Sequence, residues 1–167
     1  MIEHRIYARH CDVNAEDRLS IPLIKRCVKA TLHIEGADVP CEVSVLISND
    51  AQIRGINKEF RNIDKPTDVL SFPMQEFDSP GWAAHNVNET DPETGLLPLG
   101  EIIISAERIA AQACENNQTR DRETAYITIH SALHLLGYDH TDEAEGKRLM
   151  RSREKQIMQY IRGTGGV

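Results

Sequence analysis

The stretch HSALHLLGYDH, residues 130–140, places three histidines where one metal ion can bind them. On a helix, His130 and His134 are one turn apart and point in the same direction. Gly137 can adopt the left-handed conformation that ends a helix, and the chain then returns so that His140 approaches the same point. Three neutral imidazoles with an open fourth position are typical of a catalytic zinc site. The spacing therefore predicts one Zn²⁺ per chain.

The same histidine spacing occurs in the metzincin peptidases, whose motif is H-E-x-x-H-x-x-G-x-x-H. In those enzymes the Glu is the general base that activates the zinc-bound water. Position 131 is Ser in this chain, and a serine hydroxyl cannot act as a base without a partner. We therefore expect metzincin-like metal ligation, and the missing Glu argues against a zinc peptidase. Histidines that only cap and solvate the helix end are the alternative, which the spacing disfavours.

Two further blocks precede the histidine motif along the chain, NKEFRNIDKPTDVLSFP at residues 57–73 and LGEIIIS at residues 99–105. In residue content and order, from about Val43 to about Met150, the chain resembles the bacterial YbeY endoribonucleases. The resemblance implies a zinc-dependent endoribonuclease that cuts single-stranded RNA. It also implies a role in 16S ribosomal RNA 3′-end maturation and in ribosome quality control. Small-subunit ribosomal proteins or assembly GTPases are the partners that it suggests.

Arg61 is our candidate for contacting the scissile phosphate, because a guanidinium fork matches a phosphoryl group and stabilises charge as it develops. The residues alone leave open the alternative that Arg61 pairs with Glu59 or Asp64 across a turn. The resemblance favours the phosphate role, since the matching arginine is functional in that family. Arg61 and the metal ligand His130 are therefore the predicted catalytic residues.

The residue that transfers protons is left undecided by the sequence. The candidates are the zinc hydroxide, the substrate 2′-OH, or a carboxylate such as Glu101 or Asp139. Asp139 can instead orient a ligating imidazole. Tyr138 is expected to be a packing residue. A non-catalytic assembly factor with a structural zinc is the alternative function, because the cluster has only three evident ligands and the chain is acidic.

The charge balance speaks against a general nucleic-acid binder, since 19 basic and 26 acidic residues give a formal net charge of −7. The acids are concentrated, however, because residues 66–107 contain eight of them and no Lys or Arg. Outside that segment 19 basic and 18 acidic residues remain, and charges beyond about 8–10 Å are screened. A local basic surface near the metal is therefore compatible with the composition. Residues 143–161 form a helix of mixed signs, which we interpret as a solvated face.

The 167 residues are expected to form one domain with an α/β fold, a mixed sheet covered by helices. Strands are predicted at 3–8, 39–48, 68–72 and 101–104, and helices at 21–33, 49–60, 119–136 and 143–161, with a further helix capped by Ser105. Residues 75–98 are predicted to be a long flexible loop and 163–167 a tail.

Without a signal region or an apolar run that could cross a bilayer, we expect a cytoplasmic protein. The cysteines form no C-x-x-C pair, and we expect reduced, partly buried thiols. His4, His10 and His33 are expected at the surface or at helix ends.

Overall fold

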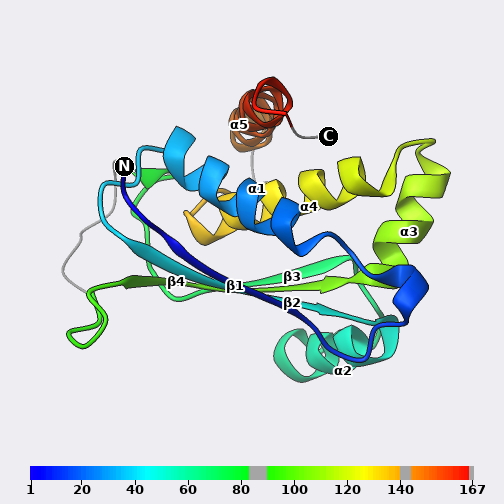
Figure 1. Cartoon of the computed structure of the whole chain (residues 1–167). Helices are drawn as coiled ribbons and strands as arrows, with labels where there is room; N and C mark the ends of the chain where they lie inside the picture. Colours follow the sequence, from blue (N-terminus) through cyan, green and yellow to red (C-terminus); the bar gives the residue numbers. More distant parts are fainter. Residues whose placement is uncertain (83–89, 140–143, 166–167) are drawn as a thin grey trace.

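A computed structural model describes residues 1–82, 90–139 and 144–165 of the chain (Figure 1). Within them, four strands form one sheet in the order β1-β2-β4-β3. These strands are β1 (Arg5–His10), β2 (Cys41–Ser48), β3 (Val69–Pro73) and β4 (Leu97–Ser105). The strands β1, β2 and β4 run parallel, whereas β3 pairs antiparallel with β4, so the predicted mixed sheet is confirmed. β1 and β3 form the two edges.

Helices cover both faces of the sheet, unequally (Figure 1). The helices α1 (Ile21–Ile34) and α4 (Arg120–Leu135) lie on one face, and α5 (Ala144–Gly163) packs on their outer side. The helix α2 (Asp50–Arg61) lies on the opposite face, and α3 (Ala106–Glu115) connects β4 to α4. A short 3-10 helix covers Ala15–Asp17. None of the helices in the described ranges has the length and apolar character needed to cross a membrane.

Local sequence signals account for most helix starts. The side chains of Ser20, Asn49 and Ser105 each accept a hydrogen bond from the backbone N–H three residues later, as N-caps do. Pro22 lies in the first turn of α1, where its missing N–H costs nothing. The predicted caps are therefore confirmed, and the helix bounds agree with prediction to within a few residues.

The core has two parts because the sheet has two covered faces. The larger part packs α1, α4 and α5 against side chains such as Val45, Ile102 and Ile104, all at most 2% exposed. The smaller part consists of Ile53 from α2, Leu70 from β3 and Ile103 from β4. Alternation along β4 thus sends neighbouring residues to opposite faces, as the period of a strand requires.

Several expectations were wrong in detail. β4 begins at Leu97 and not at residue 101, because the Leu97 N–H donates to the Pro40 carbonyl and its side chain is fully buried. His4 is buried, and its Nδ1 accepts a hydrogen bond from the Cys41 N–H at 3.2 Å. Cys27 and Cys41 are buried free thiols whose pKa burial raises to about 12, but Cys114 is exposed.

The long segment at 75–98 is anchored at both ends of its described part. The Gln75 amide donates to the Pro98 carbonyl at 2.9 Å, and the Trp82 indole donates to Asp38 at 2.7 Å. Trp82 is only 7% exposed, so this stretch packs on the core instead of extending as a free flap. Residues 83–89 lie outside the described residues.

Gly100 allows β3, β4 and α4 to meet. Its φ is +141°, and a Cβ added there would lie 2.2 Å from the Phe72 carbonyl oxygen and 3.0 Å from Cδ2 of Leu135. Backbone at this φ favours glycine, and a carbonyl at 2.2 Å cannot yield without moving β3. The register places Gly100 opposite Pro73, near the end of β3.

We predict that Gly100→Ala destabilises the protein by roughly 2–4 kcal/mol, because strain and a backbone clash combine. Thermal unfolding followed by circular dichroism should show a Tm lower by roughly 5–15 °C. Gly55→Ala is the matched control, since Gly55 lies inside α2 with nothing within 4 Å of an added Cβ. That change should stabilise by up to about 1 kcal/mol. Equal Tm values for the two variants would contradict this role of Gly100.

Candidate metal centre

The end of α4 is the turn that the histidine motif predicts. Gly137 has a φ of +85°, its N–H donates to the His134 carbonyl at 3.1 Å, and the Tyr138 N–H donates to the Leu133 carbonyl at 3.2 Å. A Cβ at residue 137 would lie 2.6 Å from Cβ of Phe77. The left-handed termination by Gly137 is therefore confirmed, and both conformation and space require glycine there.

His130 and His134 point toward one another from successive turns of α4. Their Nε2 atoms are 3.1 Å apart, and their ring centroids are 4.7 Å apart in an edge-on arrangement. Two imidazoles bound to one zinc at about 2.0–2.1 Å with tetrahedral angles would hold their nitrogens roughly 3.3 Å apart. The pair therefore fits two adjacent positions around such an ion.

Glu154 of α5 fixes the orientation of His130. Its Oε1 accepts a hydrogen bond of 2.6 Å from Nδ1 of His130. A carboxylate can only accept, so Nδ1 carries the proton and Nε2 presents its lone pair toward His134. Glu154 is only 6% exposed, which shows that the interpretation of this helix as a fully solvated charged face was wrong at this residue. Carboxylate–histidine pairs of this kind are typical behind metal-binding imidazoles.

A signal for Glu154 was present in the sequence. The buried residues of α5 are Met150, Glu154, Ile157 and Ile161, so Glu154 occupies a position in the apolar stripe of an amphipathic helix. An acid in such a stripe needs a partner when it is buried. The sequence alone, however, contains nothing that identifies His130 as that partner.

The turn that leads toward His140 is anchored by a second buried carboxylate. The Tyr138 hydroxyl donates to Oε2 of Glu35 at 2.7 Å, and Arg153 lies 3.4 Å from the other oxygen of Glu35. Burial, and then the hydrogen bond to Glu35, raises the pKa of Tyr138 to about 12. Tyr138 therefore keeps its proton near neutral pH and acts as a packing residue, as expected. His140, the third predicted ligand, lies outside the described residues.

The described residues complete only part of the predicted constellation. Among them, no group of three or more His, Cys, Asp or Glu side chains is arranged to hold a metal ion. Ser131 is fully buried, so it does not take the place of a general base beside the histidines. Glu101 is exposed on the α2 side of β4, while Ile102 packs under α1 and α4. Glu101 therefore lies on the opposite face of the sheet from His130, on the side covered by α2.

The outward face of α4 lies between α5 and the start of β3. The rings of Tyr126 and His130 are 6.0 Å apart. The pKa of Tyr126 is raised, chiefly by burial and further by the negative charges of Glu154, Glu123 and Asp68. Because Asp68 directly precedes β3, the stripe of Tyr126, His130 and His134 runs along the β3 edge of the molecule.

Arg61 is the last residue of α2 and is exposed. Asp64 is already paired with Arg54 at 2.8 Å and with Lys58 at 3.5 Å, and Arg61 has no ion pair within the described ranges. The alternative pairing of Arg61 with Glu59 or Asp64 is therefore not found. Since α2 and α4 contact β3 from opposite faces, Arg61 and the histidines lie on either side of this edge strand (Figure 1).

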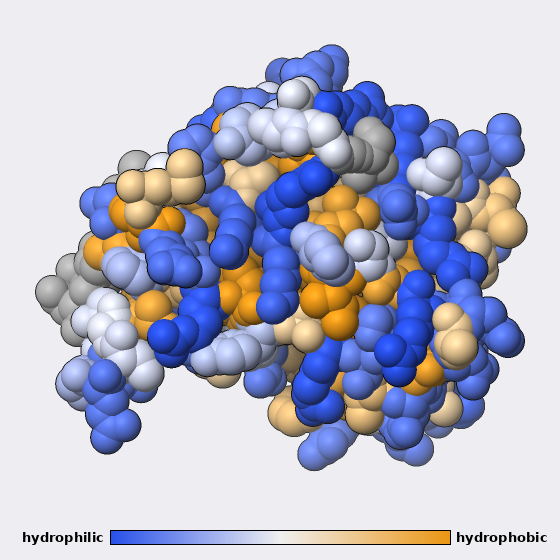
Figure 2. All heavy atoms as spheres, in the orientation of Figure 1, coloured by the Kyte–Doolittle hydropathy of each residue, from blue (hydrophilic) through white to orange (hydrophobic). Residues whose placement is uncertain are grey.

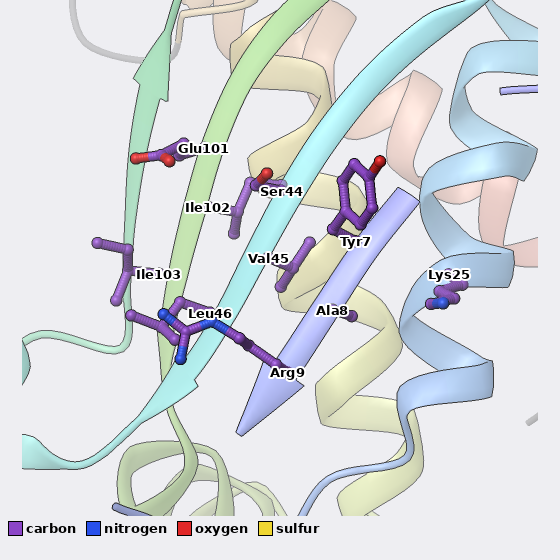
Figure 3. Close-up of a pocket in the computed structure, with 10 residues that line it drawn as sticks. All are labelled: Tyr7, Ala8, Arg9, Lys25, Ser44, Val45, Leu46, Glu101, Ile102 and Ile103. Atoms are coloured by element: carbon purple, nitrogen blue, oxygen red, sulfur yellow. The ribbon is translucent and has the colours of Figure 1, made fainter. Parts of the chain in front are cut away.

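A shallow hollow of 330 Å³ lies elsewhere, on the strands β1, β2 and β4 (Figure 3). Tyr7, Arg9, Ser44 and Glu101 are among the side chains that line it, together with Lys25 of α1. Its lining includes none of Arg61, His130 and His134, so the hollow is not part of the candidate metal centre. On the face seen in Figure 2, hydrophilic residues interleave with hydrophobic ones.

Comparisons with known proteins agree on one family. Residues 6–162 match the family model described as Endoribonuclease YbeY. The protein named Endoribonuclease YbeY from Lachnoclostridium phytofermentans is 41% identical over 143 residues, covering 83% of this chain and 86% of the relative. The protein of that name from Caldanaerobacter subterraneus is 44% identical over 139 residues, covering 83% and 85%. The solution structure of TM1509 from Thermotoga maritima shares the fold, with a TM-score of 0.57 at 23% identity, covering 96% of this chain and 93% of that one.

We predict that Glu154→Gln weakens zinc binding by roughly 10–100-fold, because the His130 ring loses the charged acceptor that orients it. Zinc affinity can be measured by competition with a chromogenic chelator, with circular dichroism to verify folding. Glu145→Gln is the matched control, since Glu145 is exposed on the same helix. Unchanged affinity in folded Glu154→Gln would remove Glu154 from the metal centre.

Proposed function

The chain belongs to the YbeY family of endoribonucleases, and from that premise we propose that it is a zinc-dependent enzyme that cuts single-stranded RNA. Family membership implies a metal-dependent enzyme that acts on RNA; zinc and the single-stranded substrate are our proposal. The observation that supports it most directly is the convergence of the His130 and His134 Nε2 atoms at 3.1 Å.

The proposed zinc ligands are His130, His134 and His140. Zinc supplies Lewis acidity toward a phosphodiester and makes water a nucleophile near neutral pH. Glu154 accepts the hydrogen bond from Nδ1 of His130, which would leave Nε2 available to bind the ion. Tyr138 and Glu35 hold the turn that precedes His140. Three protein ligands leave a position for water or substrate, which a structural site would fill.

Arg61 is the proposed phosphate ligand. Its guanidinium has no carboxylate partner within the described ranges, so it is available to a phosphate. A bidentate contact would hold the scissile group and offset negative charge as it develops. Because Arg61 and the histidines lie on opposite sides of β3, the substrate would pass over this strand edge.

We further propose that the protein acts in 16S ribosomal RNA 3′-end maturation and in ribosome quality control in the cytoplasm. Small-subunit proteins or assembly GTPases would be its partners. Residues 1–167 would act as one domain, with 75–98 as a long flexible loop and 163–167 as a tail. The acidic balance of the chain, with a net charge of −7, supports the use of protein partners, because naked RNA would be bound weakly.

A second candidate function is that of a non-catalytic assembly factor with a structural zinc, favoured by the same acidity. A zinc peptidase is disfavoured because position 131 is a buried Ser, so no carboxylate stands at the position of the general base.

Arg61→Ala should lower the rate of RNA cleavage by about 10²–10³-fold, the scale lost with one preorganised charge-stabilising donor. Folding and zinc content should stay unchanged, because Arg61 is exposed and lies on α2. Arg61→Lys should restore little, since lysine lacks the fork. Arg5→Ala is the control and should keep nearly full activity, because Arg5 is exposed on β1 at the opposite edge of the sheet. Cleavage by Arg61→Ala at the parent rate would exclude Arg61 from the reaction.

The three function classes, an endoribonuclease, a non-catalytic assembly factor and a zinc peptidase, differ in the substrate that they cut. We expect cleavage of single-stranded RNA that chelation abolishes and Zn²⁺ restores, and no digestion of casein. An assembly factor would cut neither substrate. In cells that lack the protein, His134→Ala, which removes a proposed ligand and leaves the His130–Glu154 hydrogen bond in place, should fail to restore ribosomal RNA ends, provided that its melting temperature matches the parent. Normal ends in cells carrying only that folded, metal-free variant would refute the enzyme and support the scaffold.

A further inference from the structure

An exposed aromatic ring lies directly beside Arg61. Phe60, the penultimate residue of α2, is 64% exposed, more than any other aromatic side chain in the described ranges. Its ring packs edge-on against Phe72 of β3, with centroids 5.3 Å apart and an interplanar angle of 65°. The contact with Phe72 leaves much of the Phe60 ring in solvent. Neither the core nor the metal centre explains an aromatic side chain at this position.

The Phe60 ring and the histidine-bearing end of α4 lie near the same end of the edge strand β3. Phe72 pairs with Glu101, and Pro73 pairs with Gly100. A Cβ on Gly100 would meet both the Phe72 carbonyl and Leu135, the residue that follows His134. The end of β3 therefore has the Phe60–Phe72 pair on its α2 side and the histidine-bearing end of α4 on its other side.

The charged neighbours of this ring differ from those of Tyr7, another exposed aromatic side chain on the same side of the sheet. The register places Tyr7, Ser44, Glu101 and Phe72 in one row across the strands. Tyr7 is 51% exposed at the β1 edge and shares a hollow with charged side chains of both signs, Arg9, Lys25 and Glu101. Phe60 is instead adjacent to Arg61, which no carboxylate neutralises within the described ranges. A ring beside an available guanidinium suits a nucleobase and its phosphate better than an apolar protein surface.

We infer that Phe60, held in place by its contact with Phe72, stacks on one base of the RNA strand next to the phosphate that Arg61 contacts. This inference rests on the proposed function and adds a base-binding subsite to it. Stacking uses the face that every base presents, so the subsite would favour unpaired RNA without reading its sequence. A duplex buries its base faces, and the subsite would exclude it for that reason.

The test measures binding of a short single-stranded RNA with cleavage-resistant linkages to the zinc-loaded protein, by fluorescence anisotropy over a range of salt concentrations. Phe60→Ala should weaken binding about tenfold at every salt concentration, the scale of one lost stacking contact. The slope of log Kd against log salt should not change, because no phosphate contact is lost, whereas Arg61→Ala should reduce it. Phe60→Tyr should bind like the parent.

Tyr7→Ala is the matched control, an exposed aromatic side chain at the opposite edge of the sheet. The subsite would be overturned if Phe60→Ala bound RNA as tightly as the parent, or if Tyr7→Ala lost as much affinity as Phe60→Ala. As long as the parent binds and cuts RNA, either result would leave the proposed nuclease function intact. If Phe60→Ala bound RNA normally but no longer bound small-subunit proteins, Phe60 would be part of a protein-binding surface. That result would also overturn the base-binding subsite. A parent protein that neither binds nor cuts RNA would refute the proposed function itself.

Discussion

A buried hydrogen bond between two helices, His130 to Glu154, is the constraint around which the candidate centre is organised. A carboxylate that is 6% exposed is costly unless it is paired, so α5 can pack through this position only with the imidazole in place. The same bond selects the tautomer of His130. Packing of α5 and the chemistry of α4 are therefore coupled, and a change on either helix would affect both.

The antiparallel strand β3 gives the molecule its second organising feature. The other three strands are parallel, and their order leaves β3 as an edge with α2 on one face and α4 on the other. Two short segments distant in sequence, the end of α2 and the end of α4, thereby meet the same strand. Gly100 makes this possible, because any side chain there would collide with the Phe72 carbonyl.

The acidic composition and an RNA substrate are compatible because charge is distributed unevenly. Asp64 is neutralised by Arg54 and Lys58 on the surface of α2, and such exposed pairs contribute little to stability. Their effect here is to leave Arg61 without a competing carboxylate. Glu101, by contrast, lies on the opposite face of the sheet from the histidines.

The sequence by itself determined what depends on neighbours along the chain. The caps at Ser20, Asn49 and Ser105, the left-handed turn at Gly137 and the one-turn spacing of His130 and His134 all follow from local backbone geometry, and the structure has them. The order of the blocks also indicated the family. Only the tertiary structure decided that Glu154 faces His130 from 24 positions away, that β3 reverses direction, and that Glu101 and His130 are on different faces. These depend on which surfaces bury one another, and helix or strand periodicity defines a buried face without identifying what covers it.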